Sequence, residues 1–365
     1  MSTNPVSSYE DLGVRPLINC IGTVTRYSGS LMLPEARQAM QDASQSYVMI
    51  EELMDAVGAR LAQVMACEWG LVTNGCAAAL AQVTAACIAG DDPAKMHSLP
   101  DTTNLKNEVI VQASHRMGYD RVIRAMGATF IEVTTLDDLE AAYTDRTAMI
   151  FVFGDAAERS EITVKELVAS GRAHSVPVFV DAAAERPDVP NVYLEQGVDA
   201  VAYSGGKCLR GPQASGMVLG RKDLLQAAFA NGCPNANIGR PMKAGKEEIM
   251  GLLAAVEQWV VRDHEAEWRE WERRLQVITD AVSAIDSVTH SVNTPRPSNV
   301  APHLTIQWDA AKVGVSAADV RQRLSDGDPR IEMSGGQDSV TMNPYMMEEG
   351  EAQIVARDLA AALTT

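Results

Sequence analysis

The chain has 365 residues, of which 46% are hydrophobic and 22% charged, and its formal net charge is −17. A chain of this length and composition buries a sizeable core and commonly divides into two domains, so we expect an ordinary soluble globular protein. The excess of acidic residues disfavours nucleic acid as a partner, because a phosphate backbone repels an acidic protein.

Other classes of protein and site are disfavoured by simple patterns. No stretch approaches the roughly 20 apolar residues of a membrane span, and the polar start over residues 1–5 lacks the pattern of an export signal. We therefore expect a cytoplasmic protein that does not contact a membrane. The six cysteines form no CxxC pair, which favours reduced, buried thiols over disulfides or zinc ligands. The histidines show no ligand spacing, so no metal site is predicted.

The middle of the chain alternates apolar runs with helical patterns. In chain order, strands are expected over 108–112, 129–133, 148–153, 176–180, 198–203 and 216–220, with intervening helices over 116–126, 136–143 and 164–174. Strands spaced by helices indicate βαβ crossovers and a mainly parallel sheet covered on both faces. Ligands of such sheets bind at the carboxyl ends of the strands, where Asp181 and Ser204 fall.

The later part of the chain predicts a smaller unit. A long helix is expected from Lys246 to about Asp286, because apolar residues recur there at helical spacing. Beyond it, the pattern predicts a strand over 303–308, a helix over 317–324, strands over 330–333 and 339–342, and a final helix over 349–363. The fold class is therefore α/β, with a small α+β domain at the C-terminal end. We divide the chain into an N-terminal arm and linker (1–45), a large domain (46–250), and a linking helix with the small domain (251–365).

Two residues next to expected strands suggest a cofactor. Lys207 follows one strand in the run Ser204-Gly205-Gly206-Lys207, and Asp181 directly follows the run over 176–180. A carboxylate there is either a helix cap or a functional group at the sheet edge. Pyridoxal 5′-phosphate (PLP) needs one lysine for a Schiff base and one carboxylate to keep its ring nitrogen protonated. The pair therefore predicts a PLP enzyme, and the small residue Ala183 lets a flat ring approach.

The cofactor's phosphate is expected at an earlier turn. Residues 71–80 run from a short apolar stretch through Asn74 and Gly75 into an alanine-rich helix. Free N–H groups at a helix start receive phosphate, although an Asn-Gly turn taken alone is more often only a cap. We assign Asn74, Gly75 and Cys76 to cofactor binding, and Ser204 adds a hydroxyl donor.

His115 follows the strand over 108–112. A functional histidine at this position would stack on the cofactor ring or transfer protons. The alternative is a structural residue in a first helical turn. We place it in the catalytic set with Lys207 and Asp181.

Residues 201–246 form a basic segment in an acidic chain, with seven basic residues and one acidic residue. Arg221 and Lys222 are more typical of solvated side chains that pair with acids. Arg240 and Lys243 lie among glycine and proline in a loop before a helix, and such a cationic segment attracts a small anion. We expect these two residues to bind substrate.

Ser204 and Lys207 also match the bare SxxK pattern of serine acyl enzymes. That interpretation requires the serine to open a helix and requires partner motifs that the sequence lacks, whereas Gly205 and Gly206 favour a loop. It is the weaker hypothesis.

Taken together, these motifs resemble those of the fold type I PLP-dependent enzymes. Within them the chain is similar to the selenocysteine synthase-like group, and to its D-glucosaminate-6-phosphate ammonia-lyases more than to its tRNA-handling selenium transferases. The resemblance covers most of the chain up to the long helix and rests on the runs over 16–23, 73–79, 115–120, 181–185, 204–207 and 239–243.

The resemblance implies a homodimer or larger assembly with active sites shared between subunits. It also implies Lys207 as the Schiff-base lysine, Asp181 on the ring nitrogen, and Arg240 with Lys243 as an anion-binding segment. We also assign Thr23 and Arg26 to substrate binding. We expect the chain to differ from the selenium transferases in lacking their extra N-terminal tRNA-handling region, and its acidity disfavours so large a polyanion.

The predicted activity is that of an ammonia-lyase. Lys207 removes the α-proton, and loss of a β-hydroxyl, with Lys207 or His115 as the acid, yields a 2-oxo acid and ammonia. The substrate is a hydroxylated amino acid or amino-sugar acid, with or without phosphate. The same residues also suit a racemase, an epimerase or an aldolase. An alternative from another class is a regulator that binds PLP or a sugar acid without turnover.

Overall fold

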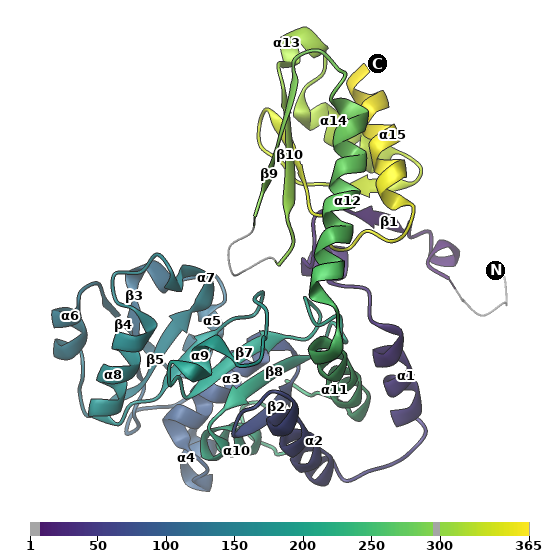
Figure 1. Cartoon of the computed structure of the whole chain (residues 1–365). Helices are drawn as coiled ribbons and strands as arrows, with labels where there is room; N and C mark the ends of the chain where they lie inside the picture. The colour runs from purple at the N-terminus through teal and green to yellow at the C-terminus, as the bar shows by residue number, and fades with distance from the viewer. Residues whose placement is uncertain (1–7, 295–299, 365) are drawn as a thin grey trace. The chain divides into compact units, whose positions relative to one another are not determined.

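The computed structural model describes residues 8–294 and 300–364 (Figure 1). The polar start over 1–5 therefore lies outside the described residues. The chain forms two compact units, of which one is Ser30–Arg262 and the other joins the N-terminal residues up to Gly29 to those from Asp263 onward.

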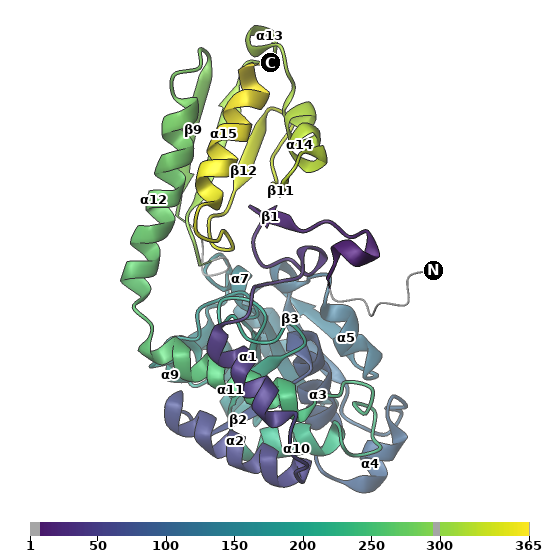
Figure 2. The same ribbon diagram turned by 90° about the vertical axis from the view of Figure 1, so that its right-hand side faces the viewer.

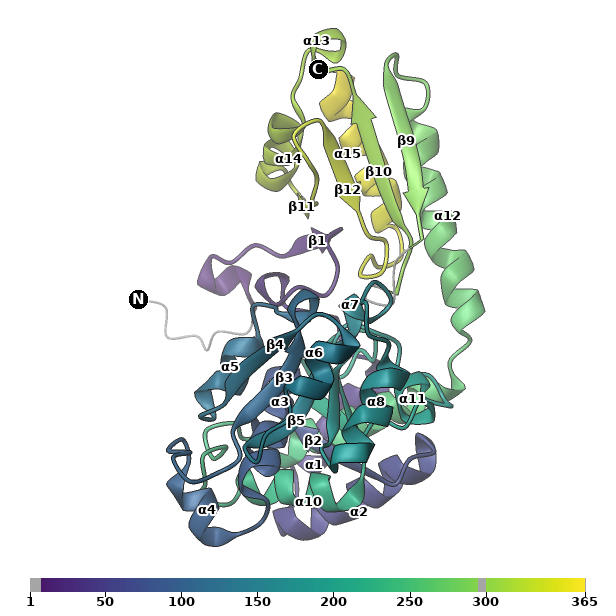
Figure 3. The same cartoon turned by 90° about the vertical axis from the view of Figure 1, so that its left-hand side faces the viewer.

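The unit Ser30–Arg262 is built on a seven-stranded sheet in the order β2-β8-β7-β6-β5-β3-β4, and Figure 3 views it from the side of β3, β4 and β5. The strands are β2 (Trp69–Thr73), β3 (Glu108–Gln112), β4 (Thr129–Val133), β5 (Thr147–Phe153), β6 (Val178–Asp181), β7 (Ala200–Ser204) and β8 (Gly216–Gly220). β8 runs antiparallel to both of its neighbours, β2 and β7, and the other adjacent pairs are parallel. The predicted α/β class with a mainly parallel sheet is confirmed, and the six strands expected from the sequence are found within two residues at each end.

The helices of this unit are α1 (Pro34–Ala43), α2 (Ile50–Val64), α3 (Gly75–Ala89), α4 (Pro93–Ser98), α5 (Asp120–Ala125), α6 (Leu136–Ala141), α7 (Gly154–Ala157), α8 (Val164–His174), α9 (Val192–Glu195), α10 (Lys222–Asn231) and α11 (Lys246–Val261), with a 3-10 turn η3 (Ala113–His115). The alanine-rich α3 is buried along most of its length and packs on β5, β6, β7 and β8. Its small side chains let a helix approach the sheet closely, which fixes where its first turn lies.

The prediction of one helix over 246–286 is wrong. Arg262 has an extended backbone between α11 and α12 (His264–Val282), and the Asp263 side chain accepts a hydrogen bond from the N–H of Ala266 at 2.9 Å. An aspartate in this position starts a new helix. The boundary between the compact units falls at this break, twelve residues after our division at 250.

The second unit is a small α+β structure, as the sequence predicts. Its elements are η1 (Glu10–Leu12), β1 (Leu17–Asn19), η2 (Thr25–Tyr27), α12, β9 (Val288–Asn293), β10 (His303–Trp308), α13 (Ala310–Val313), α14 (Ala317–Asp326), β11 (Arg330–Glu332), β12 (Ser339–Met342) and α15 (Glu351–Thr364). Because β1 pairs in parallel with β11, the segment up to Gly29 belongs to this unit and is not a separate arm.

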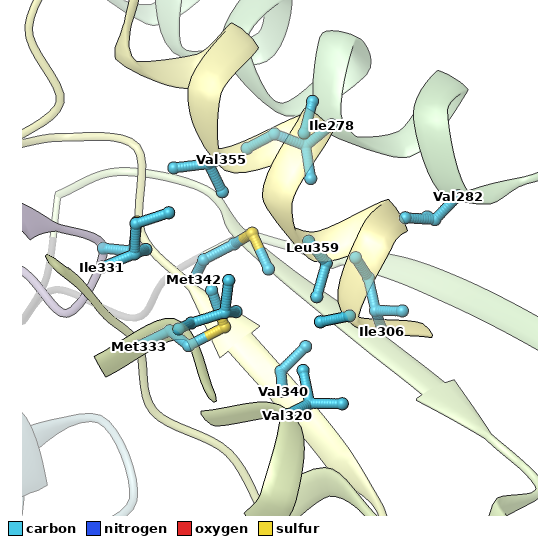
Figure 4. Close-up of a cluster of buried hydrophobic side chains, with 14 of the residues drawn as sticks. Ile278, Val282, Ile306, Val320, Ile331, Met333, Val340, Met342, Val355 and Leu359 are labelled. Carbon is cyan, nitrogen blue, oxygen red and sulfur yellow. The ribbon is translucent and has the colours of Figure 1, made fainter. Parts of the chain in front are cut away.

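One hydrophobic core holds the small unit together. The antiparallel sheet β12-β10-β9 carries inward residues such as Ile306 and Met342, while α12 and α15, which pack against each other (Figure 2), add Ile278 and Leu359. Figure 4 shows these side chains converging from sheet and helices. Within residues 8–294 and 300–364, no helix is both long enough and apolar enough to cross a bilayer.

Candidate active site

Several strand ends of the large unit meet at one edge of its sheet. Asp181 pairs with Ala202 in the register of β6 and β7, and both Ser204 and Thr73 pair with Gly216 on β8. The carboxyl ends of β2, β6 and β7 therefore lie together, where ligands bind in sheets of this kind.

Asp181 is buried, with 4% of its surface exposed. Its Oδ1 accepts hydrogen bonds from the N–H of Ala183 at 3.0 Å and from the Sγ of Cys76 at 3.3 Å. Burial raises the pKa of Asp181, and the two hydrogen bonds and the charge of Lys207 act in the opposite direction. The charge of Lys207 therefore acts on this carboxylate.

Lys207 lies in a tight loop that follows β7. The N–H of Gly205 bonds to Ser215 O at 2.8 Å, and the N–H of Gly211 returns to Gly205 O at 2.8 Å. A Cβ atom at Gly206 would lie 2.6 Å from the Cα of Gln213, so the loop excludes a side chain there. Residues 205–209 form turns rather than a helix. The SxxK hypothesis requires Ser204 to open a helix, so the structure contradicts it.

The start of α3 has the geometry of an anion site. Gly75 adopts a φ of 80°, which favours glycine. Asn74 does not cap the helix, because its side-chain amide donates to Lys243 O at 3.0 Å and to Ala214 O at 3.4 Å. The side chain of Asn74 therefore leaves the first-turn N–H groups of α3 uncapped.

Gly216 makes this approach of helix and strand possible. A Cβ atom there would lie 2.5 Å from Gly75 C and 2.8 Å from Cys76 N. The Cys76 thiol itself bonds to Asp181. Ser204 is half-buried and donates its N–H to Ala183 O at 3.2 Å.

His115 is fully buried, and both ring nitrogens are engaged. Nδ1 accepts from the N–H of Phe153 at 3.1 Å, and Nε2 contacts the Ser160 hydroxyl. Desolvation, followed by the charge of Arg159, lowers the pKa of His115 to about 4. The ring is therefore neutral at physiological pH, with the proton on Nε2.

Arg240 and Lys243 are exposed, and within the described ranges neither side chain makes an ion pair. Their loop is held to the start of α3 by Asn74. The other two residues assigned to substrate, Thr23 and Arg26, belong to the small unit.

The model of the L-seryl-tRNA selenium transferase family (SelA) matches residues 17–326. The chain belongs to this family.

Individual relatives and a solved structure cover nearly the whole chain. The 5'-C-glycyluridine monooxygenase-decarboxylase of a Streptomyces species is 32% identical over 88% of this chain and 83% of its own. The D-glucosaminate-6-phosphate ammonia lyase of Salmonella typhimurium is 29% identical over 96% of both chains. A solved D-glucosaminate-6-phosphate ammonia-lyase structure superposes with a TM-score of 0.86 at 27% identity, over 97% of both chains.

The residues at this edge fit PLP. The chain offers a helix start that a phosphate can approach, a lysine in a tight loop, and a buried carboxylate within electrostatic reach of that lysine. Within residues 8–294 and 300–364, no cluster of three or more histidine, cysteine or acidic residues is arranged to hold a metal.

Glu185 is a residue of this edge that the motifs did not single out for a role. It is buried, with 4% of its surface exposed, and its Oε2 accepts from the hydroxyl of Tyr193 at 2.7 Å. The sequence signal was its position four residues after Asp181, but nothing in the sequence shows that it is buried.

Proposed function

We propose that the protein is a PLP-dependent lyase that removes the α-proton of a hydroxylated amino acid or amino-sugar acid and eliminates its β-hydroxyl. The products are a 2-oxo acid and ammonia. The observation that carries the proposal is the buried carboxylate of Asp181, which is hydrogen-bonded to Cys76 in the first turn of α3 and lies under the influence of the charge of Lys207. The full-length similarity to D-glucosaminate-6-phosphate ammonia lyases supports the reaction class.

PLP, bound through its aldehyde and with its ring nitrogen protonated, withdraws electrons from the α-carbon of an amino acid. Lys207 would hold the cofactor, and its Nζ would take up the α-proton once the substrate amine has replaced it. Asp181 would keep the ring nitrogen protonated, because a buried carboxylate attracts a positive charge strongly. The first turn of α3 and Ser204 would hold the phosphate.

His115 suits orientation better than proton transfer. With a pKa of about 4, the His115 ring is not in its imidazolium form at neutral pH, so it is a poor acid for a leaving hydroxyl. Since the amide of Phe153 and the hydroxyl of Ser160 fix the ring, it would present a rigid flat surface to the cofactor. Lys207, protonated by the first step, is the better acid for the second.

Arg240 and Lys243 would bind the acidic group of the substrate, because their charges are exposed and not paired within the described ranges. Thr23 and Arg26 remain substrate-binding candidates. We further propose a homodimer or larger homo-oligomer with shared active sites, acting in the cytoplasm. Light scattering of the purified protein measures the oligomeric state.

Substituting Lys207 with alanine tests the assignment. We expect the variant to lose the visible absorbance of lysine-bound cofactor and all turnover. A matched variant, Lys165→Ala, removes an exposed lysine on α8 and should keep both. Retained absorbance and turnover in Lys207→Ala would refute the role.

Product analysis separates the reactions that share this apparatus. Release of 2-oxo acid and ammonia means elimination, loss of optical activity without ammonia means racemisation, and an aldehyde product means aldol cleavage. A binding regulator would show no α-proton exchange in deuterated water.

A second candidate is oxidative decarboxylation, which is favoured by the relative named as a monooxygenase-decarboxylase at 32% identity. Oxygen consumption with release of carbon dioxide would distinguish it from elimination, which consumes no oxygen.

A further inference from the structure

Two buried carboxyl groups lie close in the chain at the candidate active site. Asp181 ends β6, and the chain turns back at once, because the N–H of Glu185 donates to Ala182 O at 3.0 Å. Both side chains are 4% exposed. Two buried negative charges near each other repel strongly, so such a pair favours holding one proton.

The hydrogen bonds of the two groups are unequal. Asp181 accepts from two donors, the N–H of Ala183 and the thiol of Cys76, and it also feels the charge of Lys207. Glu185 accepts from one donor, the hydroxyl of Tyr193. Its Oε1 is buried and has no hydrogen-bond partner among the described residues. An ionised carboxylate is stabilised by donors, so these contacts favour the negative charge on Asp181.

The charges around Glu185 also favour its protonated form. Three acidic residues on neighbouring elements act on Glu185: Asp181 on β6, Asp155 on α7 and Glu158 at the end of α7. The neutral phenols of Tyr193 and Tyr203 also lie near it. Desolvation is the largest effect, and with the three acids it outweighs the bond from Tyr193 and raises the pKa of Glu185 to about 7.

Arg186, the next residue in the chain, does not pair with Glu185. Arg186 pairs with Asp188 at 3.0 Å, and its guanidinium lies 5.3 Å from the centre of the Trp259 ring. Among acids facing Glu185, Asp155 pairs with Arg159 at 2.9 Å. Glu185 therefore has no cation in an ion pair with it among the described residues.

Gly154 leaves room for this carboxyl group. A Cβ atom at Gly154 would lie well inside van der Waals contact with Oε1 of Glu185 and 2.8 Å from the hydroxyl of Tyr193. The carboxyl group therefore packs closely against the backbone that follows β5.

We propose that Glu185 holds the single proton of the buried carboxyl pair and is thereby a positioning residue that leaves the negative charge on Asp181. The inference deepens the proposed function, since it rests on Asp181 as the partner of the cofactor's ring nitrogen. Below about pH 7 a protonated Glu185 would leave that charge on Asp181, and Glu185 would lose its proton as the pH rises through about 7.

Infrared titration of the full-length chain before cofactor is added tests where the proton lies. At pH 6 we expect the carbonyl band of a buried carboxylic acid, fading as the pH rises through about 7. The band should be absent in Glu185→Gln. In Asp181→Asn it should remain, with its midpoint shifted to lower pH, because a negative neighbour is removed. Tyr193→Phe should shift the midpoint upward, because the donor that stabilises the ionised form is lost. Glu161→Gln, at an exposed acid, is the matched control and should leave the band unchanged.

A band that persists in Glu185→Gln and disappears in Asp181→Asn would place the proton on Asp181 and overturn the proposal. No band in the native chain at pH 6 would mean that both groups are ionised, which also overturns it. If Glu185→Gln does not fold, the opposite shifts in Asp181→Asn and Tyr193→Phe decide.

Nitrogen-15 NMR with labelled PLP tests the consequence. We expect a protonated ring nitrogen in the native protein and in Glu185→Gln, whose amide mimics the neutral acid, and loss of that signal in Asp181→Asn. Loss in Glu185→Gln as well would assign the contact to Glu185 and contradict the positioning role. If the native chain does not bind PLP at all, the proposed function fails, whereas the infrared result still stands.

Discussion

The substitution Gly216→Ala, which adds a single carbon atom, is the sharpest test of the proposed phosphate site. In Gly216→Ala the new Cβ would lie 2.5 Å from Gly75 C and 2.8 Å from Cys76 N. Optimal carbon contacts are about 3.5–4.0 Å, and both atoms belong to the backbone. They cannot rotate away as a flexible side chain would. Either β8 or the first turn of α3 must move.

The expected cost follows from this overlap. Overpacking a close-packed core costs about 1–3 kcal/mol, and each kcal/mol lowers the melting temperature of a unit of this size by about 2–4 °C. Because the displaced atoms belong to the proposed phosphate site, PLP should bind about tenfold more weakly for each 1.4 kcal/mol lost there.

The assay is a PLP titration followed by absorbance, together with thermal unfolding without cofactor. Gly118→Ala is the matched control, because Gly118 is exposed, has no atom within 4 Å of its Cβ position and does not adopt a positive φ. It should match the native protein in both measurements. If Gly216→Ala bound PLP as tightly as Gly118→Ala, the start of α3 would not be the phosphate site.

Three further predictions follow from single residues. The depressed pKa of His115, about 4 in the fold against about 6.5 when unfolded, means that the unfolded chain binds more protons between these values; stability should fall by about 3 kcal/mol as the pH drops through this window, and His115→Phe should flatten that dependence in urea titrations. Leu359→Ala empties a fully buried position and should cost about 2–5 kcal/mol, whereas Leu12→Ala, at a residue 64% exposed, should leave the melting temperature almost unchanged; equal effects would contradict the core described here. Lys243→Ala should raise KM for the acidic substrate with little change in kcat if the side chain binds substrate uniformly in ground and transition states, and an unchanged KM would remove this residue from the substrate site.

The sequence alone determined the strand and helix alternation and the order of the site residues. Apolar runs of strand length separated by helical patterns indicate a mainly parallel sheet without tertiary information, because buried strands and amphipathic helices have different periods. Asp181 and Lys207 were identifiable for the same reason, since each follows an apolar strand. The helix break at Arg262 was missed because the apolar pattern continues through it, and Asp263 was not recognised as a cap.

The surroundings of each functional group depend on segments that are distant in the sequence. Cys76 was expected at the phosphate, but its thiol bonds to Asp181 across 105 positions of the chain. His115 became a neutral, fixed ring because Phe153 and Ser160 are brought to it by β5 and the segment after α7. Glu185 is notable only once burial and its acidic neighbours are known. Protonation depends on desolvation and on charges from distant segments, and these quantities do not exist until the chain has folded.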